Sequence, residues 1–512
     1  MTSSVETSSP KRSSVEPLAA GNSATESPAV QPPVVEAPSV EPRAVESRAA
    51  EHSAVEPRAA ESRAAEPSAV EAPAVGAARA EALAVETPRA SSAGAPSAPA
   101  DIAELPPLTS APRRLLKHPR LMHYNRLAAL VLFANLGFLA VSWAPSAEAI
   151  GYASLVNLAL AVVVRQQYVI NLFFRLATWA PTSWPLKVRW TLGKVYHFGG
   201  LHVGGALAGA VWFLAGAVVV TVDGANAPLI TVSWILVALL VGIVATALPP
   251  FRSRFHDHFE KIHRFGGWSA LALFWTHTLL GAQGPVALGV LAVVTFSVAL
   301  PWLRLRKVDV RIERPSSHVA LARFDHGVTP FAGSSTAISR SPLKEWHSFA
   351  NVPSPGRPGF RLTISRAGDW TGSFIDDAPP KVWVKGITTA GVANIETLFS
   401  KVIYVATGSG IGPCLPHLLA AEVPSRLVWA TRDPRKTYGD DLVDEILAVQ
   451  PNALVWDTSQ HGKPDMVRLA YTAYRDFGAE AVICISNKKL TWQVVHGLER
   501  RGIPAYGAIW DS

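Results

Sequence analysis

Residues 401–417, with the sequence KVIYVATGSGIGPCLPH, decide the fold of the last third of this chain. The apolar run 402–405 predicts a buried parallel strand. Gly408 and Gly410 then allow a sharp turn close to a pyrophosphate, and the helix that follows presents free N–H groups to that anion. Pro413 is typical of the first turn of such a helix. The stretch therefore predicts a dinucleotide site made by Thr407, Gly408, Ser409, Gly410, Gly412 and Pro413.

Two further strand–helix units follow, with strands at 426–430 and 481–486. Together with the first unit they predict a doubly wound α/β nucleotide-binding domain over residues 396–512. The strand at 426–430 leads into Arg432, Arg435 and Lys436. Cations at this place can pair with an adenosine 2′-phosphate, so Arg432 favours NADPH over NADH. The alternative is ordinary solvated surface charge.

Residues 307–395 predict a small antiparallel β-barrel. Short alternating segments recur at 308–314, 319–324, 361–365 and 382–384, and Gly, Pro and Asp lie between them. This spacing is typical of strands joined by turns.

Residues 113–306 predict a bundle of six transmembrane helices. Apolar spans lie near 127–145, 148–172, 196–221, 228–248, 265–283 and 285–303, and each is about long enough to cross a bilayer. Lys and Arg occur on alternate sides of these spans, whereas the turns at 145–148, 222–227 and 281–285 carry none. By the positive-inside rule we expect an integral membrane protein, at the plasma membrane, with both termini in the cytoplasm. This orientation accounts for the net charge of +8, so we do not expect a nucleic-acid partner.

Residues 1–112 predict a disordered arm. They consist mainly of degenerate repeats of Ala, Val, Glu, Pro, Ser and Arg, without aromatic residues, and cannot bury enough apolar area to offset the entropy of ordering. A partner-binding tail is the alternative. No apolar core of a secretory signal follows the first charges. The two cysteines of the chain are too few for a disulfide framework or a four-thiolate cluster.

Four histidines lie where a membrane bundle could hold haem. His263 and His277 are fourteen residues apart and return to nearly the same face of the predicted fifth span. His197 and His202 open the third span at the depth of His263, so one of them could complete an inner haem site. At the depth of His277 the third span offers only Val211 and Gly216, which cannot bind iron. For His277 a hydrogen bond to a neighbouring helix is therefore an equal alternative.

Residues 120–512 resemble the ferric reductase and NADPH oxidase superfamily. The likeness is greatest to transmembrane flavoproteins described chiefly from fungi, some of them fused to adenylating enzymes. The residues that carry it are the pair His263 and His277, the segments His347-Ser348-Phe349-Ala350 and Gly368-Asp369-Trp370-Thr371, and the loop Gly408 to Pro413.

The resemblance implies specific roles for several residues. His347 to Ala350 correspond to a His-Pro-Phe-Thr motif that contacts FAD, and Gly368 to Thr371 resemble a companion segment. Arg366, just before that segment, is predicted to bind the cofactor as well. Cys484 would lie near the nicotinamide, and Trp510 would stack on the isoalloxazine. Two motif positions differ, because Ser348 replaces proline and Ala350 replaces the threonine that contacts flavin N5. Asn351 is a possible substitute for that threonine.

The leading prediction is a membrane oxidoreductase that passes electrons from NADPH or NADH through FAD and one haem b to a small-molecule or quinone acceptor at the membrane. A second hypothesis omits the haem and leaves a membrane-anchored reductase of a quinone or metabolite. A third is a degenerate protein that senses redox state or docks partners.

Overall fold

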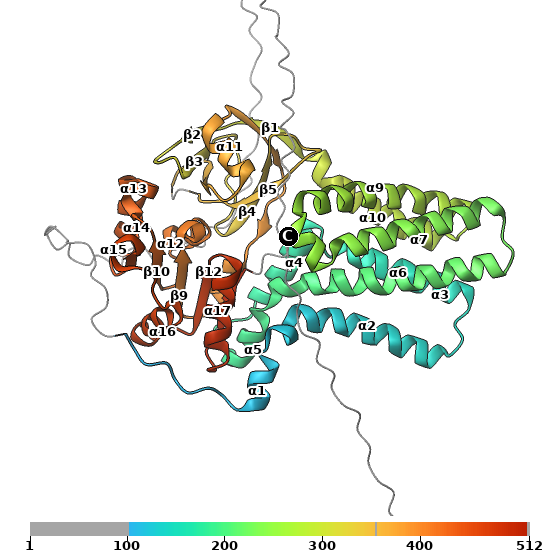
Figure 1. The fold of residues 1–512 in the computed structure, drawn as a ribbon, viewed down its shortest axis with the longest axis horizontal. Coiled ribbons are helices and arrows are strands. Elements are labelled where there is room, and N and C mark those ends of the chain that lie inside the picture. The colour runs from blue at the N-terminus through green and yellow to red at the C-terminus, as the bar shows by residue number, and fades with distance from the viewer. Residues whose placement is uncertain (1–101, 354–355, 509–512) are drawn as a thin grey trace, which may run out of the picture. The chain divides into compact units, whose positions relative to one another are not determined.

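The computed structural model describes residues 102–353 and 356–508 (Figure 1). Within this part the chain forms helices up to Leu303, then two antiparallel sheets, and then a parallel sheet flanked by helices. The predicted order of a helical part, a barrel-like part and an α/β part is confirmed.

The helical part contains six long helices and several short ones. They are α1 (Ala111–Leu116), η1 (Pro119–Leu121), α2 (His123–Ser142), α3 (Ala147–Val163), α4 (Gln167–Thr178), α5 (Leu186–Leu192), η2 (Val195–Phe198), α6 (Gly199–Val222), α7 (Ala227–Ala247), α8 (Pro249–Arg254), α9 (His256–Leu280) and α10 (Pro285–Leu303). By length and composition, four helices of the described residues could cross a membrane, or five if the bent pair α3 and α4 is one span.

The predicted second span, 148–172, is wrong in its second half. The helix ends at Val163, and α4 leaves it at an angle of 79°. The polar residues Arg165 and Gln166 interrupt the apolar run there, and the Gln166 side chain accepts a hydrogen bond from the Tyr168 N–H at 2.5 Å, which starts a new helix. The helix α9 is long enough to span, but its first turns carry Asp257, Glu260 and other charges, so its apolar part is short. A bundle of six spans stays a prediction.

Glycines of α6 allow close packing against α2 and α3. A Cβ added at Gly204 would lie 2.8 Å from the Ala128 carbonyl oxygen, and one at Gly205 would lie 2.7 Å from that of Asn157. A side chain at either position would therefore push the helices apart. These glycines serve helix packing rather than leaving room for a macrocycle.

The barrel-like part consists of two antiparallel sheets around one core. Its elements are β1 (Leu305–Asp309), β2 (Arg311–Glu313), β3 (Val319–Phe324), β4 (Ser334–Ser339), β5 (His347–Ala350), β6 (Phe360–Ser365), α11 (Asp369–Asp377), β7 (Lys381–Lys385) and β8 (Thr389–Ala390). One sheet has the order β1-β7-β4-β5 with β8 on β4, and the other has the order β2-β3-β6. Phe324, Ile338, Leu362 and Phe374 are fully buried in the core they share.

The α/β part is a five-stranded parallel sheet in the order β11-β10-β9-β12-β13. Its strands are β9 (Val402–Thr407), β10 (Ser425–Thr431), β11 (Leu454–Asp457), β12 (Ala481–Ile485) and β13 (Ala505–Gly507). Its helices are η3 (Val392–Leu398), η4 (Gly408–Gly410), α12 (Ile411–Ala420), α13 (Pro434–Tyr438), α14 (Asp440–Val449), α15 (Thr458–His461), α16 (Met466–Phe477) and α17 (Lys488–Glu499). α12 and α14 share one core with the sheet, and α16 and α17 share another, so helices cover both faces. The predicted doubly wound sheet is confirmed.

The prediction of a disordered arm fails for residues 102–112. The Ala103 N–H donates to the Thr472 hydroxyl at 3.0 Å, and the Thr109 N–H donates to the Arg500 carbonyl at 3.0 Å. Ala103 is buried, and Leu105 packs against the core under α16 and α17. This short apolar piece at the end of the repeats therefore lies along the α/β part. The rest of the predicted arm, residues 1–101, lies outside the described residues.

Candidate functional site

The glycine turn after β9 lies against the ends of two neighbouring strands. Gly408 has φ +48, in the left-handed region that favours glycine. A Cβ at Gly410 would clash with the Ile485 carbonyl oxygen at the end of β12. From β10, the Trp429 indole N–H donates to the Gly408 carbonyl at 3.1 Å. The turn therefore has a fixed position, and only glycine fits at Gly410.

Buried polar atoms without a hydrogen-bond partner gather beside this turn. They are the hydroxyl oxygens of Thr363 and Ser365 on β6 and of Tyr438 at the end of α13. A Cβ at Gly412 would lie 3.4 Å from that of Thr363, and one at Gly408 would lie 3.8 Å from the Tyr438 hydroxyl. Burial raises the pKa of Tyr438 to about 12, although weak interactions of its hydroxyl with Ser365 and Thr431 act in the opposite direction. Because buried polar groups are normally paired, this set fits a polar ligand held between the turn and β6.

The predicted nucleotide-loop residues Thr407, Gly408, Ser409, Gly410, Gly412 and Pro413 lie together from the end of β9 to the first turn of α12, as expected. Thr407 is hydrogen-bonded to the Ser486 hydroxyl at the end of β12. Arg432 is 83% exposed at its side chain and its Nε lies 3.6 Å from an Asp433 carboxylate oxygen. It is thus free to reach a phosphate, whereas Arg435 is held by Asp440 and Asp444 at 2.9 and 2.7 Å.

Cys484 lies in β12 and is fully buried, and burial raises the pKa of its thiol to about 12. It packs in the core under α16 and α17, so the structure supports the alternative of a buried strand residue over direct contact with a nicotinamide. Trp510 lies outside the described residues.

The predicted flavin segment forms β5, an exposed edge strand of the barrel-like part. The Trp370 indole from α11 stacks on the His347 ring at 4.0 Å between centroids and on Phe349 at 6.3 Å. Ser348 is exposed, and Ala350 is half-buried. Asn351 is fully buried, and its amide donates to the Ser334 hydroxyl at 2.9 Å. Its side chain is turned into the barrel, so the suggestion that it replaces the missing threonine is not supported.

Arg366 precedes α11, and its guanidinium group lies along the middle and the last turn of that helix. It donates to both carboxylate oxygens of Asp376, at 3.1 and 2.5 Å, and to the Ser317 carbonyl at 3.0 Å. The Arg366 hydrogen bond lowers the pKa of the Asp376 carboxyl. The guanidinium group of Arg366 is thus already paired with a carboxylate of the chain, at the end of α11 away from its free N–H groups.

Among the four predicted metal ligands, the structure brings His202 and His263 together. Their ring centroids lie 6.0 Å apart, at an interplanar angle of 64°. The Nδ1 atom of His202 lies 2.7 Å from the Ala161 carbonyl oxygen. A hydrogen bond donated there would fix the tautomer and leave Nε2 as the free ligand atom. His197 lies elsewhere, stacked on His123 of α2 at 5.9 Å, so the choice left open between His197 and His202 falls on His202.

Within the described residues, no second histidine lies opposite His277. Its ring contacts Phe213 of α6 at 5.3 Å, and Phe213 also contacts Phe274 at 5.1 Å. A phenyl ring thus occupies the position where an outer ligand would have to be. The structure does not support His277 as a haem ligand with a partner on α6.

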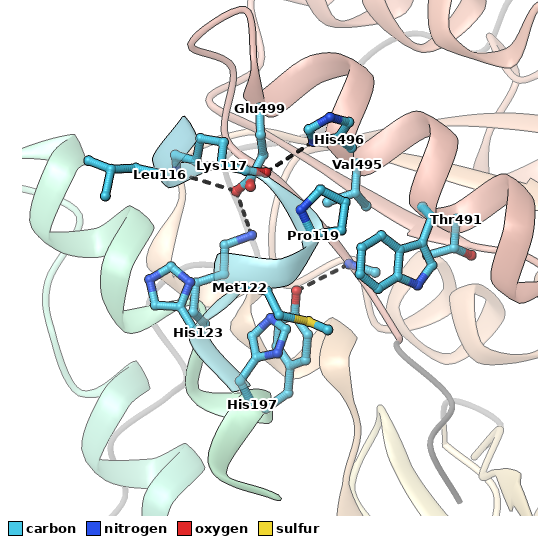
Figure 2. Close-up of a pocket in the computed structure, with 14 residues that line it drawn as sticks. Leu116, Lys117, Pro119, Met122, His123, His197, Thr491, Val495, His496 and Glu499 are labelled. Carbon is cyan, nitrogen blue, oxygen red and sulfur yellow. Dashed lines mark hydrogen bonds and ion pairs between the residues drawn. The ribbon is translucent and has the colours of Figure 1, made fainter. Parts of the chain in front are cut away.

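A cavity of about 50 Å³ lies where α17 meets the segments next to the long apolar helices (Figure 2). The Lys194 ammonium contacts the Glu499 carboxylate at 2.6 Å, and Lys117 contacts it at 3.6 Å. Burial opposes ionisation of Glu499, but the two lysines lower the pKa of its carboxyl. His123, His197 and Trp492 also line the cavity. The ion pairs bind η1 and η2 to the α/β part.

Comparison with known proteins gives relatives over most of the chain. Residues 392–512 match the family described as "Adenylate-forming reductase 03009, C-terminal domain". Adenylate-forming reductase 03009 from Coprinopsis cinerea is 44% identical over 421 residues, which are 78% of this chain and 41% of the relative. Adenylate-forming reductase 06235 from the same fungus is 40% identical over 421 residues, with the same coverage. The chain thus spans less than half the length of these relatives.

Two solved structures are similar over parts of the chain. A ferredoxin NADP+ reductase from Neisseria gonorrhoeae with bound FAD and NADP is 12% identical, with a TM-score of 0.32, over 40% of this chain and 98% of that one. A flavohemoglobin from Malassezia yamatoensis with bound FAD and heme is 16% identical, with a TM-score of 0.36, over 75% of this chain and 98% of that one. Both relatives are fungal proteins named adenylate-forming reductases. These names agree with the expected likeness to fungal proteins, some of which are fused to adenylating enzymes. Membership of the ferric reductase and NADPH oxidase superfamily stays a prediction.

Proposed function

We propose that this chain is a membrane-bound flavoprotein oxidoreductase that takes electrons from NAD(P)H and delivers them to an acceptor at the membrane. The observation that carries the proposal is the set of unpartnered buried hydroxyls of Thr363, Ser365 and Tyr438 beside the glycine turn. A parallel sheet with such a turn at the carboxyl end of its central strand is suited to a dinucleotide. The reductase names of the curated relatives agree with this chemistry.

Residues on both sides of β6 would hold the two organic cofactors. Gly408, Gly410 and the N-terminus of α12 would hold the pyrophosphate of NAD(P)H, with Arg432 near the adenosine. His347, Phe349, Arg366 and the first turn of α11 would hold FAD. When bound, flavin accepts a hydride and releases electrons singly. The chain's own part is to orient the two rings and to exclude water, and no protein base is needed for hydride transfer.

The proposal includes one haem b in the helical part. His202 and His263, whose rings lie 6.0 Å apart, would hold it, and the Ala161 carbonyl would orient His202. Bound haem carries single electrons. The proposal includes one haem only, because Phe213 faces His277.

The apolar helices support a membrane location. Phe133, Leu136 and Val141 on α2 expose 69%, 58% and 89% of their surface. Exposed apolar side chains over the length of a span are typical of lipid contact. We propose an integral membrane protein, at the plasma membrane, with the barrel-like and α/β parts in the cytoplasm. The acceptor is a quinone or another small molecule.

A haem-free reductase is the second candidate, and the phenyl ring opposite His277 favours it because full transmembrane transfer needs an outer site. The visible absorption spectrum of the purified full chain in detergent tests both. Flavin and Soret bands together support the leading proposal, and a flavin band alone supports the haem-free reductase. Protein that stays without a flavin band after addition of FAD would contradict both.

A further inference from the structure

Helix α4 is apolar on two opposite faces. One face, with Ile170, Phe174 and Ala177, packs into the core that the α/β part builds under its sheet. The other face carries Tyr168, Leu172, Leu176 and, one residue past the helix, Trp179, which expose 50%, 50%, 61% and 84% of their surface. Spacings of four, four and three residues place these four side chains in one stripe. The polar residues of α4, Gln167, Asn171, Arg175 and Thr178, form a separate stripe between these two faces. An exposed apolar stripe of this length beside a polar one is typical of a helix that lies at a lipid surface.

The polar stripe of α4 fixes the helix to the barrel-like part. The Asn171 amide donates to the Thr388 carbonyl at 2.9 Å and accepts from the Ala390 N–H at 2.8 Å. Phe173 contacts Phe198 of η2 at 6.0 Å between ring centroids. The contacts of α4 with the barrel-like part and with η2 therefore determine the direction in which the exposed stripe points.

The direction of α4 follows from its connection to α3. The two helices form an angle of 79°, and only three residues separate them. A helix that leaves a membrane span at nearly a right angle runs parallel to the bilayer surface, at the depth where the span ends. The stripe contains Tyr168 and Trp179, and these two residue types are enriched at the interface between membrane and water. Arg175 is exposed on the edge of the stripe and can extend to the headgroups.

We infer that α4 is an interfacial helix whose stripe Tyr168, Leu172, Leu176 and Trp179 is inserted into the headgroup and acyl boundary of the cytoplasmic leaflet. The inference rests on the proposed membrane location of α3. The partner of the stripe is then a lipid surface. One face of α4 would contact the bilayer, and the opposite face would contact the barrel-like and α/β parts. The helix would thereby determine the distance and the orientation of the barrel-like and α/β parts relative to the membrane surface.

Spin labels on the full chain in lipid nanodiscs test this. The two native cysteines, Cys414 and Cys484, are buried, so unsubstituted protein reports the background labelling. Leu172→Cys and Leu176→Cys place labels on the stripe. Phe133→Cys on α2 serves as the control for lipid, and Val449→Cys at the end of α14, 38% exposed, serves as the control for water. The measurement is the accessibility of each label to dissolved oxygen and to a water-soluble nickel chelate.

The inference predicts that both stripe labels are reached by oxygen and protected from nickel, at a depth of about 5–10 Å, shallower than the Phe133 label. Stripe labels as open to nickel as Val449, with Phe133 still in lipid, would overturn the inference and leave the membrane location intact. Stripe labels closed to both reagents would mean that protein covers the stripe, and would also overturn it. A Phe133 label open to nickel would contradict the proposed membrane location itself.

Discussion

Arg189 of α5 and Glu480, just before β12, form a two-fold hydrogen-bonded ion pair, 2.7 Å from Nη1 to Oε2 and 3.1 Å from Nη2 to Oε1. Arg189 also donates to the carbonyl oxygens of Trp184 and Leu398, at 2.7 and 2.8 Å. The guanidinium side chain is 5% exposed. The segment between α4 and α6 is therefore bonded directly to the α/β part, and this contact connects the proposed membrane helices to the nucleotide site.

Glu480→Gln should destabilise the α/β part by about 3 kcal/mol, because it leaves a buried guanidinium without its carboxylate. Denaturant unfolding in detergent, followed by tryptophan fluorescence, measures the loss. Glu313→Gln is the matched control, since the Glu313–Arg323 pair is exposed and should contribute at most about 1 kcal/mol. Equal effects of the two substitutions would contradict a structural role for the Arg189 contact.

The same pair predicts a dependence of stability on pH. The Arg189 hydrogen bonds lower the pKa of Glu480 from 4.5 to about 2. Because the pKa is depressed in the folded chain, the stabilisation is complete above pH 4.5 and is lost as the pH falls toward 2. The unfolding temperature of the unsubstituted chain should fall more steeply over this range than that of Glu480→Gln. Parallel curves would show that Glu480 is not the titrating group.

Gly410→Ala should abolish NAD(P)H binding and lower the unfolding temperature, because the new Cβ would clash with the Ile485 carbonyl oxygen. Gly242→Ala in α7 is the control. A Cβ there meets nothing within 4 Å, so the change should be neutral or stabilise by up to about 1 kcal/mol. Nucleotide binding by fluorescence titration, together with thermal unfolding, distinguishes the two. Normal binding by Gly410→Ala would mean that the turn does not hold the nucleotide.

Tyr438→Phe should leave stability unchanged within about 0.5 kcal/mol, because the hydroxyl that it removes makes no full hydrogen bond to the described residues and interacts only weakly with Ser365 and Thr431. If that hydroxyl serves the nucleotide, the Kd for NADPH should rise about tenfold, the loss of one hydrogen bond worth about 1.4 kcal/mol. Isothermal titration of the two proteins measures this. An unchanged Kd would remove Tyr438 from the site.

His202→Ala should remove the Soret band, whereas His197→Ala should keep it, because His202 and not His197 faces His263. Both substitutions change one histidine to alanine at the same end of the third long apolar helix, so a general loss of folding would affect both. The reverse result would assign the ligand to His197.

The sequence predicted those parts in which a local pattern has one physical solution. The run 402–413 could form only a strand, a tight turn and a helix, and the structure has β9, η4 and α12 there. The glycines in the sequence of α6 likewise indicated close packing of helices, and Gly204 and Gly205 lie against the backbones of α2 and α3. Which of His202 and His197 lies next to His263 depended on helix rotation, which spacing alone does not determine. The structure places His202 there and stacks His197 on His123.

Other features depend on contacts between residues far apart in the chain. The break between α3 and α4 was missed because hydropathy averaged over a span hides two polar residues, Arg165 and Gln166. Tyr438 was missed because its hydroxyl comes to lie near Thr363 and Ser365 of β6 only in the folded chain. These residues precede it by more than seventy positions in the sequence. The burial of Cys484 follows from α16 and α17, which cover its face of the sheet.

The central claim is that electrons pass from NAD(P)H through FAD to the haem. It is tested most directly by loading the purified full chain with FAD and titrating it with NADPH in the absence of oxygen. The account predicts that the visible flavin band bleaches and that the haem bands of the same sample then shift to the reduced form, and that His202→Ala keeps the first change and loses the second. A chain that binds FAD but whose flavin band is unchanged by both NADPH and NADH would contradict the account.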